Sequence, residues 1–127
     1  MSTDDLIHYY KSVIRPVMEY GSTVWTASLT EDQSHRLDAI QRRAEKIIDM
    51  SYATHQLSPL KQRRDDQAKK FFQSLLEPSS CLHHILPDER NPEIISRLRS
   101  ANKYPVPFAR TERFRHSFVV HGLAHYQ

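Results

Sequence analysis

Residues 9–25 read Tyr-Tyr-Lys-Ser-Val-Ile-Arg-Pro-Val-Met-Glu-Tyr-Gly-Ser-Thr-Val-Trp, and residues 37–48 read Leu-Asp-Ala-Ile-Gln-Arg-Arg-Ala-Glu-Lys-Ile-Ile. These two stretches decide the fold, because apolar residues recur in both at the three- and four-residue spacing of a helix packed on one side. Pro16 predicts a kink or a restart in the first helix, and Gly21 can end it in a left-handed conformation. Since the connection to the second helix is short, we expect the two helices to pack antiparallel.

Capping residues and prolines predict where the other helices begin and end. Thr30 with Gln33 forms a capping box, which starts the second helix, and Ser58-Pro59 is an N-cap followed by proline at the first helical position. Residues 104–107, Tyr-Pro-Val-Pro, must be extended because alternate prolines forbid a helix. The expected helices cover residues 4–28, 30–50, 58–77, 80–86 and 92–100, followed by an extended or short helical tail over residues 101–127.

The composition predicts an all-α chain. Two glycines among 127 residues and little polar/apolar alternation argue against strands and tight turns. The length suits one domain over residues 1–127, with a core that needs no covalent cross-link, and the single Cys81 excludes an intramolecular disulfide. We therefore expect a compact array of four to five helices with an extended basic carboxyl-terminal tail.

The helical spacing also predicts which side chains form the core. Trp25 and Tyr20 are expected to be core anchors, and Cys81 a small buried residue. The expected buried positions on the first helix are Leu6, Tyr10, Val13, Val17 and Tyr20. Those on the second are Leu37, Ile40, Ala44, Ile47 and Ile48. Further along, Leu82, Ile85 and Leu86 are expected to be buried, and the third helix has a row at helical spacing that comprises Leu60, Arg64, Ala68, Phe71, Phe72, Leu75 and Leu76.

The amino-terminal and apolar patterns bear on the compartment. No apolar run approaches the roughly 20 residues needed to cross a bilayer. The chain begins Met-Ser-Thr-Asp-Asp, which is acidic where a signal peptide would be basic. We expect an intracellular protein, nuclear or cytoplasmic, without a membrane partner.

Five pieces of the sequence, in order, carry a family resemblance. The first pieces are Tyr10, Val13-Ile14-Arg15-Pro16, Glu19-Tyr20-Gly21-Ser22, Val24-Trp25, Leu37, Ile40-Gln41-Arg42-Arg43-Ala44 and Ile47-Ile48. The later pieces are Leu60 with Arg63-Arg64, Leu82 with Leu86-Pro87, Leu98-Arg99, Tyr104-Pro105-Val106-Pro107, Arg110-Thr111 and the run from Arg113 to Phe118. Together they resemble the carboxyl-terminal, thumb and post-thumb region of a non-LTR (LINE-type, Jockey-like) retrotransposon reverse transcriptase.

The resemblance implies a function and also marks what is missing. In that family this region holds the template–primer duplex, while the polymerase carboxylates lie in the preceding palm. Asp4-Asp5 has no strand around it and Asp65-Asp66 lies within a helical pattern, so both are read as helix charges rather than magnesium ligands. We therefore expect a non-catalytic chain, not an enzyme.

The histidines raise the question of a metal site. Cys81 lies near His83 and His84, and His121 with His125 has the spacing of two ligands on one helical face. Neither group supplies a full set of ligands. We expect no metal and no cofactor.

Two basic zones remain as candidate sites. Residues 36–70 carry nine Lys and Arg against five acidic residues, and residues 97–115 carry six against Glu112. The candidate nucleic-acid contacts are Arg42, Arg43, Lys46, Arg63, Arg64, Arg97, Arg99, Arg110, Arg113 and Arg115. Such cations could neutralise phosphates, with Tyr104, Phe108, Phe114 and Phe118 stacking on bases. The alternative is a solvated surface with internal ion pairs and aromatics docked on the helices.

The sequence thus supports two functional hypotheses. The first is weak, sequence-independent binding of RNA or an RNA/DNA hybrid by a reverse transcriptase-like fragment. The second is a helical protein–protein interaction module that docks on a reverse transcriptase palm or self-associates, and a relic without selected function is a third reading. A fragment cut from a larger enzyme would expose apolar surface that once met its neighbour.

Overall fold

Helices form all the regular secondary structure of the described residues. The computed structural model describes residues 2–48, 57–99 and 102–127, and no strand occurs among them. The amino-terminal part contains α1 (Thr3–Tyr9), a π-helical turn (Tyr10–Ile14), α2 (Arg15–Glu19), α3 (Ser22–Trp25), a 3₁₀ turn (Thr26–Ser28) and α4 (Glu31–Ile48). The rest contains α5 (Leu60–Leu75), a 3₁₀ turn (His83–Ile85), α6 (Pro92–Ile95), α7 (Glu112–Arg115) and α8 (Phe118–His125). The all-α prediction is confirmed.

Most predicted helix boundaries agree with the structure. Gly21 has a positive φ of 63° and separates α2 from α3, while Thr30 and Gln33 exchange the hydrogen bonds of the predicted capping box. The helix predicted over 80–86 is only the 3₁₀ turn His83–Ile85, and that over 92–100 is helical only at Pro92–Ile95. Residues 49–50 and 100 of the predicted helices lie outside the described residues.

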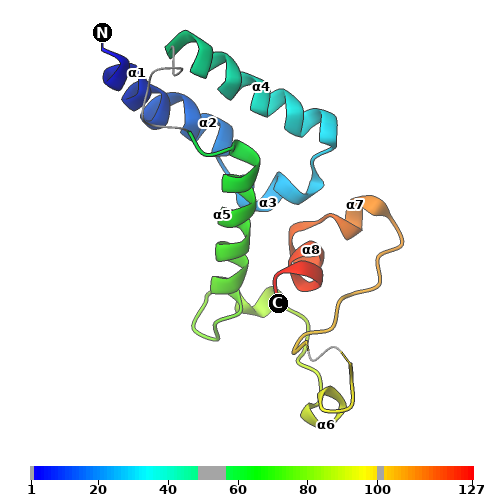
Figure 1. Ribbon diagram of the computed structural model, residues 1–127. Helices are drawn as coiled ribbons and strands as arrows, with labels where there is room; N and C mark the ends of the chain where they lie inside the picture. The colour runs from blue at the N-terminus through cyan, green and yellow to red at the C-terminus, as the bar shows by residue number, and fades with distance from the viewer. Residues whose placement is uncertain (1, 49–56, 100–101) are drawn as a thin grey trace.

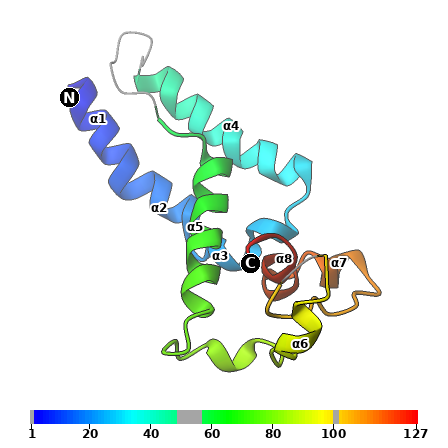
Figure 2. The ribbon, with the colours of Figure 1, turned by 60° about the horizontal axis from the view of Figure 1, so that its bottom comes forward.

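Figure 1 shows α1 and α2 running beside α4, with α5 leading away from this pair toward the carboxyl-terminal helices. In Figures 1 and 2 α8 lies beside the far half of α5, and it also contacts α3 and the 3₁₀ turn Thr26–Ser28. α6 lies at the end of the molecule opposite α4 (Figure 1). Helix α5 therefore joins two packed regions.

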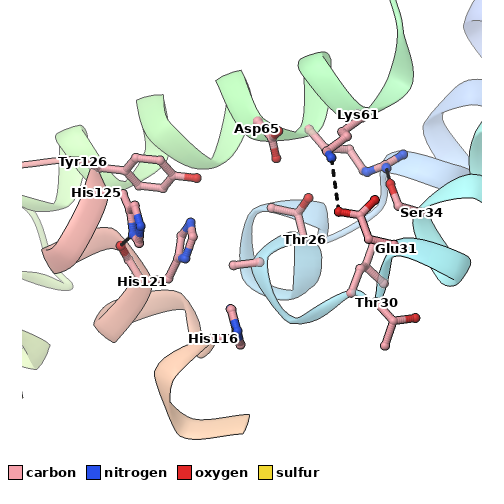
Figure 3. A pocket seen from close by; sticks show the side chains of 13 residues that line it. Thr26, Thr30, Glu31, Ser34, Lys61, Asp65, His116, His121, His125 and Tyr126 are labelled. Carbon is pink, nitrogen blue, oxygen red and sulfur yellow. Dashed lines mark hydrogen bonds and ion pairs between the residues drawn. The ribbon is translucent and has the colours of Figure 1, made fainter. Parts of the chain in front are cut away.

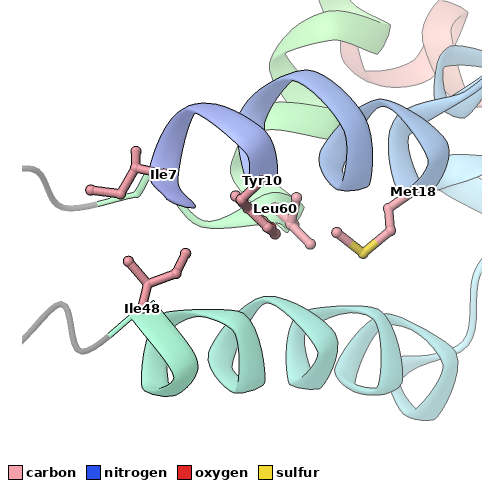
Figure 4. Packing of buried hydrophobic residues seen from close by; sticks show 5 residues of the cluster. All are labelled: Ile7, Tyr10, Met18, Ile48 and Leu60. Atoms are coloured by element: carbon pink, nitrogen blue, oxygen red, sulfur yellow. The ribbon is translucent and has the colours of Figure 1, made fainter. Parts of the chain in front are cut away.

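The first packed region lies between α1–α2, α4 and the start of α5. Its buried cluster comprises Ile7, Tyr10, Met18, Ile48 and Leu60. Figure 4 shows α1–α2 facing α4 in the opposite direction, with Ile7 near Ile48. The predicted antiparallel packing is confirmed.

The π-helical turn changes which face of the first helix is buried. A π-helical turn holds one residue more than an α-helical turn, so the inward positions beyond it move along by one. Ile14 and Met18 consequently face the core, whereas the predicted Val13 and Val17 are exposed. That part of the predicted stripe was wrong.

Helix α4 buries a row with two polar residues, Ser34 and Gln41, instead of its most apolar row. Ser34, Gln41 and Ile48 are buried, while Ile40 and Ile47 are 47% and 70% exposed. The buried Tyr10 hydroxyl donates to Gln41 Oε1 at 3.1 Å, and Gln41 Nε2 donates to Glu45 and to the Ser58 carbonyl. Because buried polar groups need such partners, these bonds account for the inward orientation of Gln41, and the predicted burial of Ile40 and Ile47 was wrong.

The second packed region lies between the end of α5 and α8. Phe72, Tyr104 and Leu123 form its buried cluster. The Phe72 ring packs near Phe118 and Tyr126, at 5.9 and 6.0 Å between ring centroids. Gly122 lies directly over the Phe72 ring, where a side-chain carbon would overlap it. The end of the chain is thus a short helix docked on α5, which agrees with the short helical form predicted for the tail.

Several predicted core residues lie at the surface. Tyr20 is 86% exposed, and Leu82 and Ile85 are exposed as well. Cys81 is also exposed rather than buried. Trp25 is half-buried and donates through Nε1 to the Tyr20 carbonyl at 3.0 Å, so it supports the turn around Gly21 instead of anchoring the core.

Candidate functional site

Three cations on α4 form the clearest basic surface. Arg42, Arg43 and Lys46 are exposed, and none forms an ion pair with another described residue. Gln41 of the same helix points into the core. The turn of the helix therefore places these three residues on its solvent side. We call these three residues the α4 basic face.

Arg63 is tied to an internal partner. Its Nε lies 2.7 Å from Glu19 Oε1 and its Nη2 lies 3.2 Å from Glu19 Oε2, a two-point ion pair between α5 and α2. Burial opposes the charged form of Glu19, but the hydrogen bonds and charge of Arg63 outweigh it and lower the pKa of Glu19. Arg63 therefore acts mainly as a link between helices, not as a free phosphate contact.

Arg64 cannot be a surface contact in this fold, which corrects the prediction. Its side chain is 1% exposed, donates through Nη2 to Ser34 Oγ at 3.1 Å, and places Nη1 3.9 Å from Asp38 Oδ1. The sequence held a signal for this position, because Arg64 falls within the buried row of Leu60 and Ala68 on α5. A basic residue that falls within the buried apolar row of a helix is placed in the interior of the protein by that row.

The tail arginines do not join the α4 basic face. Arg97 and Arg99 follow α6, which lies at the opposite end of the molecule from α4 (Figure 1). Arg110 lies just before α7, and Arg113 and Arg115 lie within it, away from both α4 and α6; Arg115 pairs with Glu112. All five are exposed. The predicted cations thus lie in three separate groups rather than along one track.

The aromatic residues of the tail divide into two packed and two exposed side chains. Tyr104 is 3% exposed, and Phe118 packs on the second cluster, so neither presents a free ring face to a base. Phe108 and Phe114 are exposed. Only these two remain available for the stacking that was predicted for the tail.

A pocket of about 450 Å³ lies between α8, the start of α4 and the first half of α5. Figure 3 shows His121, His125 and Tyr126 at one end and Lys61, Glu31 and Ser34 at the other, with Thr26 between them. The Lys61 ammonium lies 3.8 Å from Glu31, and the rim also carries His116 and Asp65. Sequence reasoning grouped His121 with His125 but not with these distant residues.

The histidines of this pocket lie close to one another. The rings of His121 and His125 stack with centroids 4.3 Å apart, and the His116 ring is 6.4 Å from that of His121. Burial, followed by the nearby His125 and His116, lowers the pKa of His121, while Asp65 acts in the opposite direction. The pocket therefore favours a neutral His121, and protonation would oppose the docking of α8.

The chemistry available to this pocket is limited by its geometry. His125 Nδ1 lies 3.0 Å from the His121 carbonyl, and His116 Nε2 lies 3.4 Å from Glu112, so two of the three rings already have internal partners. The part of the chain that the structure describes places no group of three or more His, Cys, Asp or Glu side chains to hold a metal ion.

Comparisons with protein-family models, curated proteins and solved structures found no match to this chain. Among the described residues, no helix has both the length and the apolar character needed to cross a bilayer.

Proposed function

We propose that this chain is a non-catalytic helical fragment, resembling the post-palm region of a retrotransposon reverse transcriptase, that weakly binds RNA or an RNA/DNA hybrid without reading sequence. The observation that carries the proposal is the α4 basic face, where Arg42, Arg43 and Lys46 project from one helix without an ionic partner among the described residues. Cations of this kind contact phosphates and contribute affinity that falls as salt rises.

The same argument limits the strength of binding. Arg63 is committed to Glu19, Arg64 is buried, and the tail arginines are distant from α4. About three phosphates can therefore be neutralised at once by the α4 basic face. Non-specific complexes of this electrostatic kind have dissociation constants of about 10⁻⁴ to 10⁻⁶ M at physiological salt.

Fluorescence anisotropy with a labelled RNA/DNA hybrid at low salt tests the proposal. The triple variant Arg42→Glu, Arg43→Glu and Lys46→Glu should abolish binding. A matched control carries Lys11→Glu, Lys69→Glu and Lys70→Glu, which changes the net charge equally at exposed positions on the first helix and on α5. Equal loss in both variants, or no binding by the wild-type chain, would refute a specific role for the α4 basic face.

A second function, from another class, is protein docking or self-association, with a polymerase palm as one partner. The exposed apolar side chains Ile40 and Ile47, which lie two turns apart on the same side of α4, favour it, since exposed apolar surface commonly marks an interaction site. Light scattering at increasing protein concentration separates the two functions. A dimer that persists at high salt supports self-association, while a monomer that binds nucleic acid supports the first proposal.

A further inference from the structure

Helix α4 carries an apolar row on the side that faces solvent. Leu37, Ile40, Ala44 and Ile47 follow one another at spacings of three, four and three residues, which is the heptad spacing of a helix that packs along another helix. Ala44 packs on the first core cluster, Leu37 is half-buried, and Ile40 and Ile47 are exposed. The row thus runs along the edge of the core, with Ile40 and Ile47 open to solvent.

The row continues into a groove at the start of α4. Trp25 and Leu29 form one wall, and Gln33, Leu37 and Ile40 form the other, around a volume of about 580 Å³. Ile47 extends the apolar row about two helical turns beyond Ile40. The groove is shallow and largely open to solvent, which suits the side of a helix better than a small molecule that must be enclosed.

The charges beside this groove select among possible occupants. Arg36 lines it, and Arg43 lies one heptad further along the same flank, both exposed and without an ion pair to another described residue. On the opposite flank, Ser34 and Gln41 are buried against the chain's own core. An occupant therefore meets apolar side chains bordered by positive charge on one side only.

A second copy of the chain fits this surface poorly. In an antiparallel pair of α4 helices, the flanking positions of the two copies face one another, so Arg36 of one copy would lie against Arg43 of the other. Like charges placed opposite each other are destabilising. In a parallel pair, Arg36 and Arg43 of one copy would face the flank of Ser34 and Gln41 on the other copy, which is already buried against that copy's own core.

We propose that this groove binds an amphipathic helix of a partner protein, whose apolar row is bordered by aspartate or glutamate side chains. The apolar row of α4 supplies the contact area, and Arg36 with Arg43 sets the orientation by pairing with the acidic border of the partner. This inference specifies the partner of the protein-docking function and does not depend on nucleic-acid binding.

Trp25 provides a direct readout, because it is the only tryptophan of the chain and lines the groove. The probe is a helix-forming peptide of about 20 residues, free of tryptophan, with leucine at the heptad core positions and glutamate beside them. A second peptide carries lysine in place of glutamate. The wild-type chain should show a saturable change in Trp25 emission with the acidic peptide and bind the basic peptide at least about tenfold more weakly.

Three variants test the groove. Ile40→Ser should weaken binding of the acidic peptide about tenfold, since a central apolar anchor is removed, whereas Val17→Ser on α2 should leave it unchanged. The double variant Arg36→Glu and Arg43→Glu should reverse the preference between the peptides, and circular dichroism should confirm that each variant is folded. The absence of saturable binding to the wild-type chain, equal binding of both peptides, or insensitivity to Ile40→Ser would overturn the proposal. Self-association that Ile40→Ser abolishes would also overturn it, by showing that a second copy occupies the groove.

Discussion

The two packed regions are held together by different kinds of contact. In the first, between α1–α2, α4 and α5, directional polar links accompany the apolar cluster: Tyr10 to Gln41, Arg63 to Glu19, and Arg64 to Ser34. In the second, between α5 and α8, the buried residues are mainly aromatic, and the docked helix carries a half-buried histidine. The first region therefore depends on matched polar partners, and the second on close packing and on histidine remaining neutral.

Phe72→Ala should have the largest effect, because Phe72 is fully buried at the centre of the second cluster. Truncating a buried phenylalanine costs about 3–5 kcal/mol of the free energy of unfolding, measurable by urea denaturation. Hydrogen exchange should show the loss mainly in α8. Phe71→Ala, at a neighbouring and more exposed position, is the matched control, and an equal loss in both variants would contradict the assignment of Phe72 as the centre.

Gly122→Ala should destabilise the second region next most strongly. Alanine is favoured over glycine in a helix by about 1 kcal/mol, but the added methyl group would overlap the Phe72 ring. Overpacking of this kind costs about 1–3 kcal/mol. Thermal unfolding followed by circular dichroism should show a lower midpoint. Combining Gly122→Ala with Phe72→Leu should cost less than the sum of the two single changes, and strict additivity would argue against the contact.

Glu19→Gln tests the polar links of the first region. It removes the charge from the pair with Arg63, so we expect a loss of about 1 kcal/mol in the free energy of unfolding. Glu31→Gln is the control, because the Glu31 pair with Lys61 is solvent-exposed and such pairs contribute about 0–1 kcal/mol. A loss from Glu31→Gln as large as that from Glu19→Gln would contradict the distinction.

Mild acid should destabilise the second region and leave the first unchanged, and this is the smallest of the expected effects. The pKa of His121 is lowered in the folded chain from its usual 6.5, so its stabilising contribution is complete above that value and is lost as pH falls below it. The pKa of Glu19 is lowered from 4.5, so its contribution persists until pH falls below that value. Asp65 opposes the effect of acid on His121, while the neighbouring His125 and His116 add to it.

Hydrogen exchange measured at pH 7.5 and pH 5.5, corrected for the intrinsic pH dependence of exchange, checks this prediction. Amides of α8 should lose protection at the lower pH while those of α4 keep it. His121→Gln should remove most of the difference, because the replacement does not titrate. Equal protection of α8 at both pH values would show that the histidines do not control its docking.

The positions of the amino-terminal helices were predictable from sequence because local signals set them, whereas the helices predicted over 80–86 and 92–100 are much shorter. The Thr30 capping box and Gly21 act within one turn, and both are confirmed. The buried face was less predictable. It depends on the π-helical turn Tyr10–Ile14 and on partners distant in sequence, such as Tyr10 for Gln41. Helical spacing alone cannot distinguish an apolar row that faces the core from one that faces solvent.

The candidate site was predictable only where the cations are local to one helix. Arg42, Arg43 and Lys46 are exposed together on α4, and their spacing alone places them on one side of a helix. Arg63 and Arg64 looked equivalent in sequence, but their roles depend on Glu19 and Ser34, which are more than 25 residues away in the chain. The separation of the tail arginines from α4 likewise depends on the path of the chain and not on any local pattern.

The salt dependence of nucleic-acid binding tests the central proposal most directly. For the wild-type chain and a labelled RNA/DNA hybrid, the logarithm of the binding constant should fall linearly with the logarithm of the salt concentration, with a slope of about −2 to −3 for three phosphate contacts. Replacing only Arg43 by glutamine should reduce the magnitude of this slope by about 1, whereas Lys70→Gln should leave it unchanged. A wild-type slope near zero, or one that Arg43→Gln does not alter, would contradict phosphate binding by the α4 basic face.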